Sequence, residues 1–334
     1  MSSAPHSLGV PPPGPPPSVA GPPPALPVQS REYHHFWRAP RSTWWKALLA
    51  MVLLLIAFFA LQAVAGAVGV LIDVATGTST LDSLDTFTVT PAIFLALNLS
   101  LGAMIPISMW LAWAFTGQRP GWLSSVEGRF RWRWMTKCLI IVLPVYLLYV
   151  GIGTAVGGPF PGPLQPNAIL LLIMVLLTTP FQCAGEEYAV RGLLVRGVSS
   201  WISRPLLALV TATLLTGLLF ASGHPNLDVW KVLGLLVFAS MASILTWRTG
   251  GLEAACLAHT ANNMLLMVPA ALWGDFTALL NANTPGTPLA VGLELIVAAL
   301  VIGGVEWLAR RSRIARTSAP GREVADAIGR TSQP

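Results

Sequence analysis

Glu186 and Glu187 stand side by side at the end of a long apolar stretch, and Arg191 follows four residues after Glu187. If this segment is helical, Glu187 and Arg191 share a helix face and can form an ion pair. Glu186 then points about 100° away from its neighbour. The spacing predicts one glutamate compensated by an arginine and a second glutamate free to act on another group. Taken alone, the segment could also be an ordinary salt bridge at a membrane interface.

Two histidines and an asparagine lie in later apolar stretches. His224 follows Phe220 by four residues at the end of one stretch, and His259 precedes Asn263 by four residues inside another. On a helix, His259 and Asn263 share a face. Each histidine could be a hydrogen-bonded structural residue. However, a charged side chain inside a bilayer costs about 2.5–3.5 kcal/mol, so ionisable groups that gather in apolar segments indicate function.

Together these side chains have the chemistry of a hydrolytic site. Two imidazoles and a carboxylate are usual ligands of a catalytic divalent metal, so Glu186, His224 and His259 predict a metal site, with zinc as a candidate. The same groups could instead activate a water without a metal, with Glu186 as the general base. The amide of Asn263 could stabilise a developing oxyanion. The residues alone leave both routes open.

The motifs Glu-Glu-x-x-x-Arg, Phe-x-x-x-His and His-x-x-x-Asn occur in this order on three hydrophobic segments between Asn167 and Ala270. In this respect the sequence resembles the CPBP family. That family contains the type II CAAX prenyl endopeptidases and bacterial bacteriocin-processing and immunity-type membrane proteins. The resemblance implies that Glu186 activates the attacking water and that Glu187 and Arg191 are its structural companions.

The resemblance also assigns roles to the later motifs. It implies that His224 and His259 position the water or a divalent metal, and that Asn263 stabilises the oxyanion. Glu253 and Asn262 are polar residues outside the motifs, and we expect no catalytic role for them.

The elements that position these residues must be membrane helices. Only 10% of the 334 residues are charged, against about 25% in soluble domains. Apolar blocks of about 20 residues are typical of membrane helices. Eight such blocks occur: Trp45–Ile72, Pro91–Phe115, Cys138–Val156, Asn167–Ala184, Leu206–Phe220, Val232–Trp247, Leu252–Leu272 and Leu289–Leu308. We expect an all-α, multi-pass protein of the cell membrane with about eight transmembrane helices. Its net charge of +6 indicates contact with anionic lipid rather than nucleic acid.

Basic residues alternate between the connections, which predicts that both the N- and C-termini are cytoplasmic. Lys231 is the one exception to this alternation. This topology places Glu186 near the cytoplasmic end of its helix and His224 near the outer end of the next. A shared site therefore requires a tilted helix, a helix that continues past Glu186, or a shallow re-entrant segment.

The sequence predicts five regions. Residues 1–43 form a proline-rich tail that is expected to be disordered, and residues 310–334 form a basic disordered tail. Residues 44–160 carry the first three helices and a basic-aromatic cytoplasmic loop, residues 161–272 a CPBP-like intramembrane protease domain, and residues 273–309 the last helix. Trp37, Trp44 and nearby basic residues are expected to lie at the membrane interface. Cys138, Cys183 and Cys256 have no paired spacing and are expected to be small core residues.

Other functional classes fit the sequence less well. A rhomboid-like serine dyad would need glycine where Phe220 stands, and no His-Glu-x-x-His motif of soluble zinc proteases occurs. A transporter would be expected to show internal repeats, and none is evident. A non-catalytic membrane scaffold or a bacteriocin-immunity protein is the main alternative. We expect an intramembrane endopeptidase that cleaves a membrane-associated or lipidated protein or peptide, using glutamate-activated water with histidine assistance. Its substrate and oligomeric state are not encoded in a readable pattern.

Overall fold

The computed structural model describes residues 24–78, 88–157, 163–224, 227–274 and 286–322. In these ranges the chain is almost entirely helical, with one pair of short strands. The elements are β1 (Arg31–Glu32), η1 (Tyr33–His35), α1 (Trp44–Ala75), α2 (Pro91–Gly102), α3 (Met104–Thr116), α4 (Gly121–Ser124), α5 (Trp132–Gly157), α6 (Ala168–Glu187), η3 (Tyr188–Leu194), α7 (Val195–Trp201), α8 (Pro205–Ser222), α9 (Val229–Thr249), α10 (Glu253–Trp273), α12 (Pro288–Arg311) and β2 (Thr317–Ser318).

Eight helices or continuous helical runs in the described ranges are long and apolar enough to cross a membrane. Each overlaps one of the eight predicted blocks, and the prediction of an all-α, multi-pass integral membrane protein is confirmed. Large apolar side chains also cover the outside of the bundle, as Leu48 and Phe59 of α1 and Leu177 of α6 show. Lipid is the solvent in which such a surface is stable.

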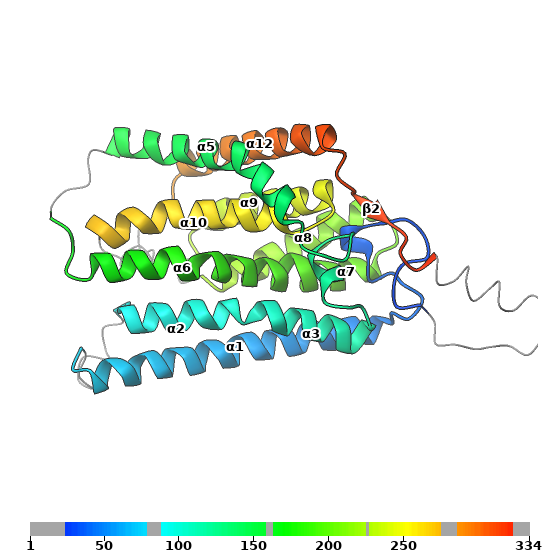
Figure 1. Cartoon of the computed structure of the whole chain (residues 1–334), viewed down its shortest axis with the longest axis horizontal. Coiled ribbons are helices and arrows are strands. Elements are labelled where there is room, and N and C mark those ends of the chain that lie inside the picture. Colours follow the sequence, from blue (N-terminus) through cyan, green and yellow to red (C-terminus); the bar gives the residue numbers. More distant parts are fainter. Residues whose placement is uncertain (1–23, 79–87, 158–162, 225–226, 275–285, 323–334) are drawn as a thin grey trace, which may run out of the picture.

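The long helices run side by side, with α6 and α10 at the centre of the bundle (Figure 1). In this view α1, α2 and α3 lie on one side of α6, while α5 and α12 lie beyond α10. Contacts confirm the order: α6 packs on both α2 and α10, α10 also packs on α5, and α9 packs on α12. The two central helices carry the residues of the first and third motifs.

The fourth predicted block does not end near Glu186. Instead α6, the π-helical segment η3 and α7 form one helical run, Ala168–Trp201. A single π-helical turn within a longer helix is often found at functional sites. Glu186 therefore lies in the middle of a membrane-spanning run. The structure thus adopts one of the geometries that a shared site requires, a helix that continues past this residue.

Gly185 lets α6 approach the junction of α2 and α3. A methyl group at this position would overlap the carbonyl oxygen of Leu101. Only glycine permits this close backbone approach. This contact fixes the position of Glu186 and Glu187 along the bundle axis relative to α2.

Residues 24–43, 117–131 and 312–322 cover one end of the bundle, and we call this layer the cap. Strands β1 and β2 pair antiparallel within it, with Arg31 opposite Ser318 (Figure 1). Strand β1 precedes the first long helix and β2 follows the last one. Their pairing therefore places both ends of the described chain at this end of the bundle. Which side of the membrane the cap faces stays a prediction.

The expected disorder of the tails is wrong for residues 24–43 and 310–322. Phe36 and Trp37 are buried against the bundle instead of lying at the lipid interface, whereas Trp44 is exposed as expected. The aromatic rings bury enough apolar surface to order a segment whose upstream proline runs suggest a tail. Residues 1–23 and 323–334 lie outside the described residues, and the division into five regions otherwise stays a prediction.

Candidate active site

Glu187, Arg191 and His259 form a buried charged group between the two central helices. Arg191 Nη1 donates to Glu187 Oε1 at 3.0 Å, and His259 Nδ1 lies 2.8 Å from the same oxygen. All three side chains are buried, and Glu187 is completely enclosed. The ion pair predicted from the four-residue spacing is therefore present, and it also holds the histidine of α10.

Two aromatic rings complete the surroundings of Arg191. Its guanidinium carbon lies 5.9 Å from the ring centre of Phe220 and 5.8 Å from that of Phe238. A cation over an aromatic face is stabilised electrostatically, most of all where water is excluded. Phe238 also packs edge-on against His259, with ring centres 4.8 Å apart. The sequence analysis missed Phe238, which lies in α9 outside the three motifs.

Glu186 occupies a different environment from its neighbour. Its side chain is 17% exposed, and His259 Nε2 lies 3.4 Å from its Oε2. Gln182 Nε2 donates to its Oε1 at 2.7 Å. No arginine or lysine among the described residues forms an ion pair with it. The Glu187 carboxylate is thus paired with Arg191 and enclosed, whereas the Glu186 carboxylate faces a cavity.

Gln182 connects Glu186 to the asparagine of the third motif. Asn263 Nδ2 donates to Gln182 Oε1 at 3.3 Å, and Asn262 Nδ2 donates to Asn263 Oδ1 at 3.1 Å. The amide of Gln182 therefore orients both a candidate base and a candidate oxyanion donor. Sequence reasoning overlooked Gln182, although it precedes Glu186 by four residues and so shares its helix face.

His224 lies near these residues but does not join their hydrogen-bond network. It is exposed, its Nδ1 lies 3.0 Å from the carbonyl oxygen of Phe220, and its ring packs on that of Phe220. Within the described ranges, no group of three His, Cys, Asp or Glu side chains is close enough to hold a metal ion. Glu186, His224 and His259 as placed do not form a three-ligand set. Metal binding therefore stays a prediction.

A cavity of about 940 Å³ brings the motif residues together. Glu186, His224, His259 and Asn263 line it, whereas Glu187 and Arg191 do not. Its remaining wall is largely apolar and comes mostly from α1, α2, α8 and α9, including Leu54, Phe58, Phe94, Leu219 and Leu235. Residues of α3, α5, η3 and α12 complete it. Such a cavity suits a substrate that has both an apolar segment and a polar reacting group.

The heights of the motif residues agree because α8 runs back along the helical run Ala168–Trp201. The turn between them lies after Trp201 and before Pro205. Both helices rise by about 1.5 Å per residue. Glu186 lies 15 residues before Trp201, and Phe220 lies 15 residues after Pro205. The two residues therefore lie at the same height along the bundle.

Comparison with known proteins identifies this part of the chain. Residues 166–265 match the family described as type II CAAX prenyl endopeptidase Rce1-like. They form an Rce1-like domain. The chain is also 30% identical over 152 residues to "Uncharacterized protein YyaK" of Bacillus subtilis (strain 168), an alignment that covers 43% of this chain and 50% of the relative. The chain thus aligns with about half the length of this curated relative, and no solved structure matches it.

The Rce1-like domain contains all six predicted site residues and is anchored to the rest of the bundle at the start of α10. Glu253 Oε1 accepts from the backbone N–H and from Nε of Arg131, both at 2.8 Å. Arg131 Nη2 donates to Glu253 Oε2 at 2.7 Å. These bonds use both carboxylate oxygens of a fully buried side chain. Glu253 thus has a structural partner and lies outside the lining of the cavity.

Proposed function

We propose that this protein is an intramembrane endopeptidase that hydrolyses a peptide bond with water activated by Glu186. The observation that carries the proposal is the unequal environment of the two glutamates. Arg191 and His259 bind Glu187 away from the cavity, whereas Glu186 faces the cavity without a cationic arginine or lysine partner in the described residues. A general base must reach a solvent molecule and remain free to accept its proton.

In the proposed reaction, a water molecule in the cavity is bound by Glu186 and by His259 Nε2. Glu187 is bonded to Nδ1 of His259, and this contact favours the tautomer with the proton on Nδ1 and an accepting Nε2. Glu186 removes a proton from the water as its oxygen attacks the carbonyl carbon. Glu186 then returns the proton to the amine as the C–N bond breaks. General acid–base catalysis of this kind contributes roughly 10²–10⁴-fold.

Asn263 is the proposed donor to the carbonyl oxygen that becomes negative during the attack. One N–H of its amide is directed to Gln182, which leaves the second N–H for this oxygen. Because Gln182 also holds Glu186, a single amide sets the distance between the base and the oxyanion donor. Preorganised donors of this type are worth about 10²–10³-fold in turnover.

The apolar cavity wall supports a membrane-associated or lipidated protein or peptide as the substrate. The wall lies within membrane-spanning helices, so an apolar segment of a substrate can remain out of water while its peptide bond meets Glu186. The Rce1-like match supports a CAAX-protease-like reaction at the level of the family. A prenylated protein and a membrane peptide without a prenyl group both fit this wall.

The test compares N-terminal peptide profiles of membranes from cells that express the wild type, Glu186→Gln or Glu294→Gln at equal levels. Glu294 lines the same cavity from α12 but forms no hydrogen bond with the site residues in the described structure. New N-termini with the wild type and Glu294→Gln, but not with Glu186→Gln, would support the proposal and name the substrate. Identical profiles from three folded proteins would refute it and favour a non-catalytic scaffold or immunity role.

A further inference from the structure

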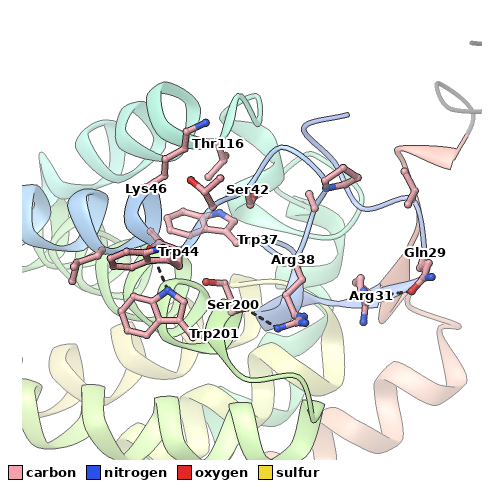
Figure 2. Close-up of a pocket in the computed structure, with 16 residues that line it drawn as sticks. Gln29, Arg31, Trp37, Arg38, Ser42, Trp44, Lys46, Thr116, Ser200 and Trp201 are labelled. Atoms are coloured by element: carbon pink, nitrogen blue, oxygen red, sulfur yellow. Dashed lines mark hydrogen bonds between the residues drawn. The ribbon is translucent and has the colours of Figure 1, made fainter. Parts of the chain in front are cut away.

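A second cavity, of about 820 Å³, lies where the cap meets the ends of α1 and α7. Its lining combines residues of the N-terminal segment with Thr116, Ser200 and Trp201 (Figure 2). No residue lines both this cavity and the one that contains Glu186. It is therefore a separate site, for which the proposed peptidase reaction has no use.

The charge of this cavity is positive. Arg31, Arg38 and Lys46 line it, and none of its described lining residues is acidic. Arg38 is partly engaged, because its Nη1 donates to the carbonyl oxygen of Ser200 at 2.8 Å (Figure 2). Arg31 Nη2 donates to Gln29 Oε1 at 3.0 Å (Figure 2), and Lys46 Nζ lies 5.8 Å from the ring centre of Trp45. Neither forms an ion pair among the described residues, so Lys46 at the start of α1 keeps a cation without an acidic partner for a negatively charged ligand.

The N-terminus of α1 adds further donors. Thr43, which precedes the helix, makes no capping bond with its side chain, and Thr43, Trp44 and Lys46 line the cavity. The first N–H groups of a helix lack partners within the helix and attract anions. Helix α1 is long enough for this effect, since it runs from Trp44 to Ala75.

Three polar atoms in the lining are buried without a hydrogen-bond partner in the described structure. They are Nε of Arg31, Nε1 of Trp37 and Oγ of Ser42. The Trp37 side chain is only 1% exposed, and Figure 2 shows its indole beside Ser42 in the middle of the lining residues. A buried N–H without a partner is costly. These atoms independently indicate a ligand that carries acceptor oxygens.

The lipid-facing side of α1 continues from this cavity. Trp44 and Leu48 line it and are exposed, and Val52 and Ile56 follow at four-residue intervals with exposed side chains. Residues spaced in this way lie on one helix face. A molecule whose oxygens bind in the cavity could lay hydrocarbon chains along this face. Tryptophan at the mouth, as with Trp44 and Trp201, is typical of headgroup depth.

We propose that this cavity binds the phosphate of an anionic phospholipid. Lys46 contacts the phosphate oxygens, Trp37 Nε1–H and the Ser42 hydroxyl donate to them, and the acyl chains follow Leu48 and Val52, whereas Arg31 lies at the far end of the lining beside Gln29 (Figure 2). A bound lipid of this kind joins the cap to the start of α1. The proposal does not depend on the peptidase activity.

The test is native mass spectrometry of the purified full chain after incubation with equal amounts of phosphatidylglycerol and phosphatidylcholine. We expect the wild type to retain phosphatidylglycerol preferentially. Lys46→Gln should weaken retention by roughly tenfold, because a charge-assisted hydrogen bond to the phosphate is lost. Trp37→Phe, which keeps a six-membered ring but removes the N–H, should weaken it by roughly threefold to tenfold.

The matched control is Lys137→Gln, which removes one exposed lysine charge near the start of α5, at the same end of the bundle. It should retain phosphatidylglycerol as the wild type does, and melting temperatures verify that each variant is folded. Equal retention of the two lipids, or an equal loss in the control, would refute a specific site. Displacement of the lipid by millimolar inorganic phosphate would refute the lipid assignment, because the cavity would then accept a free anion.

Discussion

The two adjacent glutamates should respond differently to the same substitution. Glu186→Gln should abolish proteolysis with little change in stability. Glu187→Gln should abolish proteolysis and also destabilise the fold. The reason is that Glu187 Oε1 is bonded to both Arg191 and His259 in a fully buried position, whereas Glu186 accepts one hydrogen bond, from Gln182, beside the cavity.

The magnitudes follow from these contacts. Removal of one partner from a buried ion pair costs about 3–5 kcal/mol, because the other charge remains buried and unpaired. Here the unpaired group would be Arg191, whose side chain is 1% exposed. Loss of the bond between Glu186 and Gln182 should cost no more than about 0.5–1.5 kcal/mol. The melting temperatures of the two variants should therefore differ on the order of 10 °C.

Thermal unfolding can be followed with a thiol-reactive fluorescent probe. Cys138, Cys183 and Cys256 are free and buried, so they react only when the bundle opens. The protein is purified in detergent, and turnover is measured on a substrate found by the N-terminal profiling. Equal melting temperatures for Glu186→Gln and Glu187→Gln would refute the assignment of one compensated and one free carboxylate. Full activity of Glu186→Gln would refute its role as the base.

Three further predictions concern packing, pH and metal. Gly185→Ala should destabilise the protein by about 1–3 kcal/mol, because the added methyl group would meet the carbonyl oxygen of Leu101. The control Gly66→Ala, whose methyl group would enter open space, should leave the stability unchanged. Equal melting temperatures for the two variants would contradict the close approach of α6 to Leu101. Burial lowers the pKa of His34 and of His35 to about 4. The unfolded chain therefore binds more protons below the unperturbed pKa of about 6.5, and stability should fall as the pH falls from about 6.5 to about 4; melting temperatures that stay constant over this window would refute the prediction. If Glu186 activates water without a metal, proteolytic activity should survive dialysis against a chelator. If dialysis abolishes the activity and added zinc restores it, a metal is required.

The membrane helices could be predicted because their apolar blocks are long and separated by charged connections. The ion pair of Glu187 with Arg191 was also predictable, since it lies within one helix and depends only on a four-residue spacing. The sequence could not reveal that α6 continues into η3 and α7. Arg191 and Arg196 look like the basic flank at the end of a helix, but both are buried. Arg196 stacks on the ring of Tyr33, 3.7 Å from its centre.

Contacts between distant segments account for the other residues that sequence reasoning missed. Phe238 reaches Arg191 from α9, and no local pattern distinguishes it from other apolar residues of that helix. Trp37 and its neighbours follow a proline-rich stretch, and their burial depends on surfaces supplied by later helices. Gln182 is different, because its position one helical turn before Glu186 was a usable signal.

The cap also has a consequence for how the chain is made. Helices enter the membrane in order of synthesis, but β1 near the start of the chain pairs with β2 near its end. Phe36 and Trp37 belong to the same buried cluster as Leu193 and Leu252, which are translated much later. Until then these rings lack part of the buried cluster to which they belong. A nascent chain that has not yet reached β2 therefore lacks the strand that pairs with β1.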